Sequence, residues 1–144
     1  MKFVRILILI LIALSLKSSL FALDSLEKIS FDVAQKQLDA YNSKNLEEFI
    51  SAYTNDVEVY QFPDSLIYKG IDKMKKVYKE FFDRSPKVIC RLINRIVNGK
   101  YVIDFESISN HHSAIDFEAV AMYEVENGLI KKVWFLPRKS FYYK

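Results

Sequence analysis

Two adjacent histidines and two nearby carboxylates are the residues of this chain whose types could perform acid–base chemistry. His111 and His112 closely follow a segment that contains Asp104 and Glu106. Imidazole groups exchange protons near neutral pH, and a carboxylate close to one can complete an acid–base pair. Adjacent side chains of an extended segment point to opposite sides, so only one histidine can face a given cavity. We take His112 and Asp104 as the candidate catalytic residues.

Other kinds of catalytic or cofactor site find no support in the sequence. The three glycines are too few for a phosphate-binding or dinucleotide-binding loop, and no nucleophile elbow is present. Adjacent histidines also lack the spacing of two that metal ligands on a strand favour. Cys90 is the only cysteine, and its alternating apolar neighbours predict a buried, unreactive thiol. We therefore expect neither a cofactor nor a metal ion.

The dipeptide Asn98-Gly99 predicts how the carboxylates are positioned. It lies between two β-prone segments and favours a two-residue type I′ turn, which would pair Val97 with Lys100. One face of this hairpin would then carry the charged residues Arg91, Arg95, Asp104 and Glu106. The other face, which we expect to be buried, would carry Cys90, Leu92, Asn94, Ile96, Tyr101, Ile103 and Phe105. The charges therefore predict an ion-pair ladder on the outer face, unless a β-bulge reverses the alternation and turns the carboxylates inward.

A second dipeptide, Asn127-Gly128, predicts a second hairpin in which Glu126 faces Leu129. An unbroken register would place Ala121 opposite Trp134, and a small residue beside a bulky one leaves room for a concavity. We expect a cavity lined by aromatic and weakly polar side chains, namely Tyr41, Tyr60, Gln61, Asn94, Tyr101, Ala121, Tyr123 and Trp134. Such walls suit a flat or apolar small molecule. The alternative is that the same side chains simply fill the interior.

Helical patterns precede the hairpins. Apolar residues at helical spacing predict a helix over 26–41 and another over 71–82, which begins after Gly70. Between them, Asn45 with Glu48 three residues later is typical of a capped helix start. Short strands are predicted over 57–62 and 66–68. Helices followed by a curved, mostly antiparallel sheet of about six strands make an α+β arrangement.

Residues 1–22 have the features of a secretory signal peptide. A short basic region precedes an apolar run over 6–16, which is shorter than the roughly 20 residues that a membrane crossing needs. We expect cleavage after this leader, one domain over 23–144, a secreted or periplasmic location and no stable membrane anchor. The three basic residues of the leader account for the whole formal excess of 21 basic over 18 acidic residues. The mature chain would be neutral, and no nucleic-acid partner is expected.

The order of several segments resembles the nuclear transport factor two-like superfamily, specifically its SnoaL-like and steroid isomerase-related branch. The resemblance rests on Ala40–Phe49, on Tyr53–Val59, on Gly70 and on Tyr123–Ile130. It implies a cone-shaped barrel in which three N-terminal helices pack on the sheet and a pocket lies between them.

The same resemblance argues against steroid isomerase chemistry. That chemistry uses a tyrosine on the first helix, a carboxylate base on the first strand and a protonated aspartate on a late strand. The corresponding positions fall on Gln37, Gln61 and Ala121, none of which can perform the role.

These observations predict an exported protein that binds a small apolar or aromatic molecule and forms a homodimer through the outer face of its sheet. Two alternatives remain open. One is an acid–base isomerase, lyase or hydratase acting in the barrel cavity. The other is a non-catalytic protein-interaction module whose barrel is filled.

Overall fold

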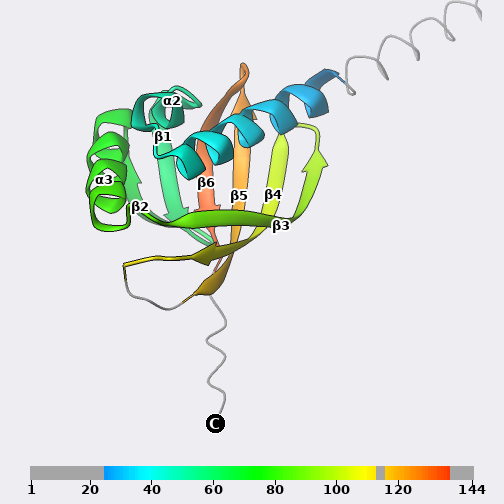
Figure 1. Ribbon diagram of the computed structural model, residues 1–144. Coiled ribbons are helices and arrows are strands. Elements are labelled where there is room, and N and C mark those ends of the chain that lie inside the picture. Colours follow the sequence, from blue (N-terminus) through cyan, green and yellow to red (C-terminus); the bar gives the residue numbers. More distant parts are fainter. Residues whose placement is uncertain (1–24, 113–115, 137–144) are drawn as a thin grey trace, which may run out of the picture.

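The computed structural model describes residues 25–112 and 116–136, which form an α+β fold (Figure 1). A long N-terminal helix spans residues 25–43, followed by the short helix α2 (Leu46–Ile50) and later by α3 (Ile71–Arg84). One six-stranded sheet has the order β2-β1-β6-β5-β4-β3. Its strands are β1 (Tyr53–Gln61), β2 (Ser65–Lys69), β3 (Ile89–Asn98), β4 (Tyr101–Ser109), β5 (Phe117–Glu126) and β6 (Leu129–Phe135). Only β1 and β6 pair in parallel, so the predicted fold class is confirmed.

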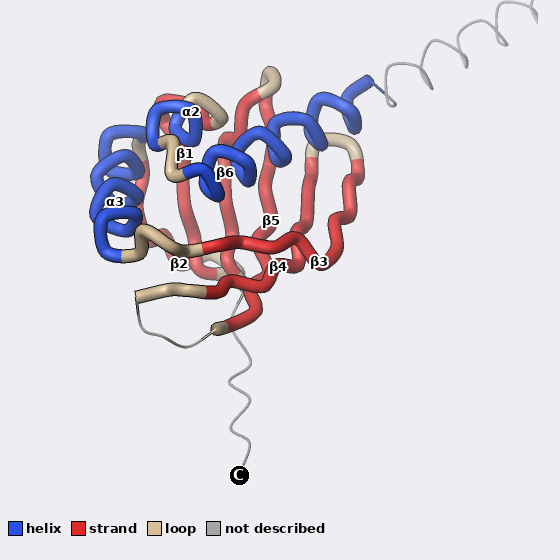
Figure 2. The backbone as a smooth tube through the Cα atoms, viewed as in Figure 1, coloured by secondary structure: helices blue, strands red, loops and turns tan. Residues whose placement is uncertain are grey.

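The helices cover one side of the curved sheet. Figure 2 shows the N-terminal helix crossing the sheet, while α2 and α3 stand at the end formed by β1 and β2. α3 contacts both of these strands as well as α2. β3 bends sharply along its length, so that its first half turns across the end of the sheet (Figure 2). The helices and the bent strand together surround the inner face of the sheet.

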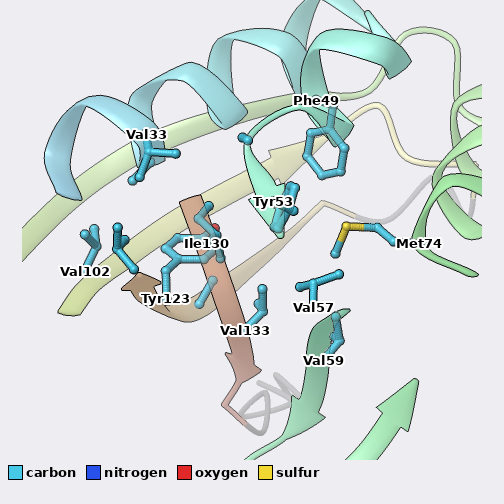
Figure 3. Packing of buried hydrophobic residues seen from close by; sticks show 14 of the residues in the cluster. Val33, Phe49, Tyr53, Val57, Val59, Met74, Val102, Tyr123, Ile130 and Val133 are labelled. Atoms are coloured by element: carbon cyan, nitrogen blue, oxygen red, sulfur yellow. The ribbon is translucent and has the colours of Figure 1, made fainter. Parts of the chain in front are cut away.

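The main core lies between the helices and the inner face of the sheet. Figure 3 shows its buried side chains, among them Val33, Phe49, Tyr53, Val57, Met74, Val102, Ile130 and Val133. Each fully buried apolar side chain of this size contributes about 1.5–3 kcal/mol through removal from water. A second cluster of Leu38, Val88, Cys90 and Ile108 packs beneath Phe81 and Phe117. Cys90 is a free, buried thiol, as its neighbours predict.

Local sequence signals account for the helix starts. The Asn45 side chain accepts a hydrogen bond from the backbone N–H of Glu48 at 3.2 Å and donates to the Glu48 carboxylate at 3.1 Å. The predicted cap of α2 is therefore present. Gly70 precedes α3 with a φ of 90°, a conformation that side chains rarely adopt.

The first hairpin differs from its predicted register. Asn98 pairs with Tyr101, so the turn is displaced by one residue, and the register shifts again between Leu92 and Asn94. This shift is a β-bulge, which changes the side of the sheet that the β3 side chains face. Inward-facing residues of β4 are Val102, Asp104, Glu106 and Ile108, whereas Tyr101, Ile103 and Phe105 face outward. The prediction of an outer-face ladder of arginines and carboxylates is therefore wrong, because the two carboxylates lie on the buried side.

The second hairpin keeps its predicted turn but not its full register. Glu126 pairs with Leu129 as expected, and a shift between Glu124 and Val125 displaces the rest. Ala121 consequently faces Phe135, while Trp134 pairs with Met122. Ala121 is fully buried and Trp134 lies on the other face, so the predicted concavity between these two residues is wrong.

The predicted leader, residues 1–22, lies outside the described residues, and the secreted or periplasmic location remains a prediction. Within residues 25–112 and 116–136, the helices lack the combination of length and apolar character that a membrane crossing requires.

Candidate functional site

A cavity of about 410 Å³ lies between the helices and the inner face of the sheet. The N-terminal helix, α3 and all six strands contribute to its walls. Its lining includes the apolar and aromatic residues Leu38, Tyr41, Tyr53, Val59, Tyr68, Val77, Tyr78, Phe81, Ile108, Phe117, Tyr123 and Val133. Among its polar members are Gln37, Gln61, Arg84, Cys90, Glu106 and His111.

The aromatic wall is built by α3 and the N-terminal helix. The α3 residues Tyr78 and Phe81 recur at helical spacing and pack against Tyr41, with ring centroids 6.4 and 5.9 Å from that ring. Phe49 supports Tyr78 from α2 at 4.2 Å. This interlocked packing fixes the rings of the wall, so the cavity has a defined apolar shape.

Glu106 is the carboxyl group of the cavity. It projects from β4 and is only 7% exposed. Burial, followed by the nearby negative charge of Asp104, raises the pKa of Glu106 from 4.5 to about 7. The Cys90 thiol hydrogen-bonds to the carboxyl group and opposes part of this rise in pKa. A carboxyl group with this pKa holds its proton in a large fraction of molecules at neutral pH.

Asp104, two residues before Glu106, is in a different position. Arg95 holds it in a bidentate ion pair, with Nε to Oδ1 and Nη2 to Oδ2 both at 2.7 Å. The two side chains are 4% and 0% exposed. The third guanidinium nitrogen of Arg95 donates to Gln35 at 3.1 Å and to the backbone carbonyl of Phe31 at 3.5 Å, both on the N-terminal helix. The pair therefore fastens this helix to the sheet, and Asp104 does not line the cavity.

Three polar side chains form a buried hydrogen-bond chain beside the cavity. The Gln37 amide donates to the Tyr123 hydroxyl at 3.2 Å and accepts from the Tyr53 hydroxyl at 3.3 Å. Burial raises the pKa of both tyrosines well above the usual value of 10, so both hydroxyls keep their protons. These groups place hydrogen-bonding capacity in an otherwise apolar enclosure.

The structure places His111, rather than His112, on the cavity. The His111 ring lies between Phe81 and Phe117, at 5.5 and 5.6 Å between ring centroids. His112 turns toward the C-terminal end of α3, where its Nδ1 lies 3.1 Å from the hydroxyl of the capping residue Ser85. The two predicted catalytic residues, His112 and Asp104, are thus not brought together at the cavity, because the histidines diverge and Asp104 is paired with Arg95.

The predicted ligand-binding residues divide into two groups. Those that line the cavity are Tyr41, Gln61 and Tyr123. Those that do not are Tyr60, Asn94, Tyr101, Ala121 and Trp134. Tyr60 stacks on Trp134 on the outer face at 5.8 Å, Asn94 and Tyr101 are exposed, and Ala121 is part of the core. The register shift of the second hairpin moves Trp134 away from Ala121, and Tyr101 lies on the outer face of β4 because the side of this strand predicted to be buried is the outer one. Contact of any of these residues with a ligand remains a prediction.

From the sequence we did not predict that Glu106 and Gln37 both line the cavity as polar groups. The alternation along β4 is unbroken, so Glu106 faces inward together with Val102 and Ile108, and the sequence pattern does not show which side of this strand the helices cover. Among the described residues, no three His, Cys, Asp or Glu side chains are grouped so that they could hold a metal ion. The site can instead enclose a small molecule and exchange a hydrogen bond or a proton with it.

Comparisons with known proteins agree with this fold. A protein from Novosphingobium aromaticivorans described as having a cystatin fold is similar at a TM-score of 0.69, with 19% identity over 75% of this chain and 97% of that one. A candidate ketosteroid isomerase from Kribbella flavida also has a TM-score of 0.69, with 17% identity over 79% and 81%. An LEH-like epoxide hydrolase from M. tuberculosis has a TM-score of 0.62, with 14% identity over 76% and 82%.

At these identities, the structural likeness shows the fold alone. A search of curated proteins finds no match to this sequence. The model of the SnoaL-like domain family matches residues 34–133, which confirms the resemblance noted in the sequence. The chain therefore belongs to the SnoaL-like domain family.

Proposed function

We propose that this protein binds a small, largely apolar or aromatic molecule in the cavity between its helices and its sheet. The observation that carries this proposal is the cavity of about 410 Å³, whose walls are mainly apolar and include both aliphatic and aromatic side chains. Small-molecule sites are commonly apolar enclosures of about 300–1,000 Å³ with a few polar groups that orient the ligand. Glu106, Gln37 and the Tyr123 hydroxyl would supply those polar groups here.

The cavity also argues against the alternative of a protein-interaction module whose barrel is filled by side chains. Tyr41, Tyr78 and Phe81 pack against one another along the wall and leave the space beside them open. A module that acted only through its surface would gain stability from filling this space, because unfilled apolar volume costs about 24 cal/mol per Å³. Retaining the space is easier to explain if a ligand occupies it.

The test is binding of a neutral fluorescent probe, N-phenyl-1-naphthylamine, to the full-length chain. We expect saturable binding of one probe per protomer. The variant Ala119→Phe adds a ring to the cavity lining and should abolish that binding. The matched control Ile103→Phe adds bulk to the outer face of β4 and should leave binding unchanged. Absence of saturable binding, or equal binding by both variants, would contradict the proposal.

A second candidate function is acid–base catalysis on the bound molecule, as in an isomerase, lyase or hydratase. The observation that favours it is the Glu106 carboxyl group, whose pKa of about 7 suits proton transfer near neutral pH. His111 at the edge of the cavity could serve as a second proton carrier. The structural neighbours named as an isomerase and an epoxide hydrolase support an enzyme only as members of the same fold.

This second function is tested once a ligand has been identified by native mass spectrometry of the protein purified from its host. Glu106→Gln should abolish turnover of that compound while it retains binding. The control His112→Gln should keep turnover, because His112 points away from the cavity. Undiminished turnover by Glu106→Gln would contradict a catalytic role for this residue.

A further inference from the structure

The cavity combines one buried carboxyl group with several aromatic rings, and this combination indicates the charge of its ligand. We infer that the cavity binds an apolar or aromatic molecule bearing an organic ammonium group, whose positive charge pairs with the Glu106 carboxylate beside the surrounding tyrosine rings. This inference rests on the proposed binding function and specifies its ligand class. Carboxylates of the same shape would bind less tightly.

Glu106 is a buried carboxyl group without a cationic partner. Among the described residues that line the cavity, it is the only carboxylic acid, and it is 7% exposed. The nearby Arg95 guanidinium is held by Asp104 through two bonds of 2.7 Å and by the N-terminal helix. In the part of the chain that the structure describes, no cation forms an ion pair with Glu106. A buried charge is costly unless it is paired, so a ligand cation would supply the missing partner.

Four tyrosines that line the cavity lie within electrostatic reach of Glu106. They are Tyr41 on the N-terminal helix, Tyr53 on β1, Tyr78 on α3 and Tyr123 on β5. Burial raises the pKa of each hydroxyl, and the charge of Glu106 contributes to each rise. The rings are therefore neutral, and the face of a neutral aromatic ring carries partial negative charge that attracts organic cations. A carboxylate among such rings favours an ammonium ion over a neutral or anionic group.

The remaining groups of the enclosure leave its interior neutral or negative. Asp104, two residues before Glu106, adds a negative charge that Arg95 balances. Burial raises the pKa of the Cys90 thiol and of the Tyr68 hydroxyl, so both groups keep their protons. An ionised Glu106 therefore gives this interior one net negative charge.

Two groups that can carry positive charge lie at the edge of the cavity. Arg84, in the last turn of α3, is exposed, so water and ions screen its charge. His111 lies between the rings of Phe81 and Phe117, at 5.5 and 5.6 Å between centroids. Both groups would repel an ammonium ion placed beside them. They favour an orientation in which the ammonium group points inward to Glu106 and the apolar part of the ligand lies toward the edge.

The experiment compares three ligands of matched shape on the full-length protein: 2-(aminomethyl)naphthalene, 2-ethylnaphthalene and 2-naphthoate. Displacement of bound N-phenyl-1-naphthylamine reports the affinity of each ligand. At about pH 8 we expect the ammonium ligand to bind about tenfold more tightly than either of the others, through a charge-assisted hydrogen bond to the Glu106 carboxylate. At about pH 6 its affinity should fall about tenfold, because Glu106, with a pKa of about 7, then mostly holds its proton while the alkylammonium group stays charged. The hydrocarbon should bind equally at both pH values.

The variant Glu106→Gln removes the carboxylate and keeps the size of the side chain. At about pH 8 it should bind the ammonium ligand at least about tenfold more weakly than the wild type does, and this affinity should no longer depend on pH. The matched control Glu118→Gln removes an exposed carboxylate outside the cavity and should preserve both the affinity and its pH dependence. A pH dependence that persisted in Glu106→Gln would assign the titration to His111 and overturn the inference.

Proton release gives a readout that does not depend on a variant folding. At about pH 6 the wild-type protein should release about one proton for each ammonium ligand bound, because Glu106 must lose its proton to form the ion pair. Calorimetry in buffers of different ionisation enthalpy counts this proton. Binding of the hydrocarbon should release none.

Each other outcome is decisive. Equal binding of the ammonium ligand and the hydrocarbon, with no proton release, would overturn this inference and leave the proposed binding function intact. Tightest binding of the naphthoate would also overturn it and indicate an anion site at Arg84 and His111. Failure of all three ligands and of N-phenyl-1-naphthylamine to bind would overturn the proposed function together with this inference.

Discussion

The two faces of strand β4 carry side chains in the reverse of the usual order. Its inner face holds Asp104 and Glu106 between buried apolar residues, while its outer face presents Tyr101, Ile103 and Phe105 at least partly to solvent. A sheet with one covered face normally buries its apolar residues and exposes its charges. Buried carboxylates cost free energy unless they are paired or protonated, and exposed apolar rows often mark a contact surface. The reversal therefore indicates that neither face of β4 is arranged for stability alone.

The free-energy cost of burying a carboxylate is offset differently for the two acidic residues of the inner face. Asp104 is compensated by Arg95 through two short hydrogen bonds, whereas no cation within residues 25–112 and 116–136 forms an ion pair with Glu106, which is accommodated by holding a proton. The Arg95–Asp104 ion pair is structural, since it also connects the N-terminal helix to the sheet. Protonated Glu106 instead provides a proton donor in the cavity.

Removing one partner of the Arg95–Asp104 ion pair should have the largest effect on stability. Asp104→Asn should lower the free energy of unfolding by about 3–5 kcal/mol, because it leaves the Arg95 charge buried without a counterion. Urea denaturation followed by circular dichroism measures this loss. The double variant Arg95→Met/Asp104→Leu removes both charges and should recover most of the stability. A loss below about 1 kcal/mol in the single variant would contradict a supporting role for the pair.

Removing the proton of Glu106 requires only a rise in pH. The fold raises the pKa of Glu106 from 4.5 to about 7, so folding favours the protonated form. The stabilisation is complete below about pH 4.5 and is lost as the pH rises through about 7, a difference of about 3 kcal/mol in unfolding free energy. Subtracting the pH profile of Glu106→Gln isolates this contribution from other titrating groups. Parallel profiles for the two proteins would show that Glu106 is not protonated by the fold.

The contrast between the faces also shows how far the sequence could be read. The Asn-Gly turns, the Asn45 cap and the helical spacing predict the order of elements and the fold class, because each depends on a few neighbouring residues. The identity of the residues that line the cavity depends on which side chains of each strand face inward. The shift between Leu92 and Asn94 lets both Cys90 and Arg95 face inward, and no local pattern encodes it. The prediction of which strand faces are buried was therefore wrong, whereas the predicted fold class is confirmed.

The outer face carries a continuous apolar row across all six strands. Register pairs connect Ile96 to Ile103, Ile103 to Met122, Met122 to Trp134, Trp134 to Tyr60 and Tyr60 to Leu66. The neighbouring row reads Glu124, Lys132, Glu58 and Lys69, with charges that alternate in sign. We propose that this face binds a second copy of the chain. Under a two-fold axis the charged row meets its own reverse, which places each glutamate opposite a lysine.

A charge in the apolar row should separate the two copies. We expect Met122→Lys to weaken a homodimer at least about tenfold in Kd, or about 1.4 kcal/mol, because the new ammonium would be desolvated at the contact. Sedimentation velocity over a concentration series measures the change. Ile29→Lys makes the same kind of substitution at an exposed apolar residue of the N-terminal helix and should leave the dimer unaffected. A monomeric wild-type protein at micromolar concentrations would contradict the proposed dimer.

The smallest expected effect sharpens the comparison between buried and exposed ion pairs. Lys69 binds Glu58 on the outer face at 2.7 Å, the same separation as in the Arg95–Asp104 pair, yet the Lys69 side chain is 55% exposed. Glu58 also accepts from the Tyr60 hydroxyl at 2.8 Å, so it keeps a partner when Lys69 is removed. Lys69→Met should therefore change the free energy of unfolding of the monomer by less than about 1 kcal/mol.

The measurement is again urea denaturation, made on the Met122→Lys background so that association does not contribute. If Lys69→Met cost as much as Asp104→Asn, distance rather than burial would decide the strength of these pairs, and the contrast between the two faces would fail. A small loss that disappears at high salt is the expected result, because water and ions screen the exposed pair. The loss in Asp104→Asn should persist at the same salt concentration, because its pair is screened much less.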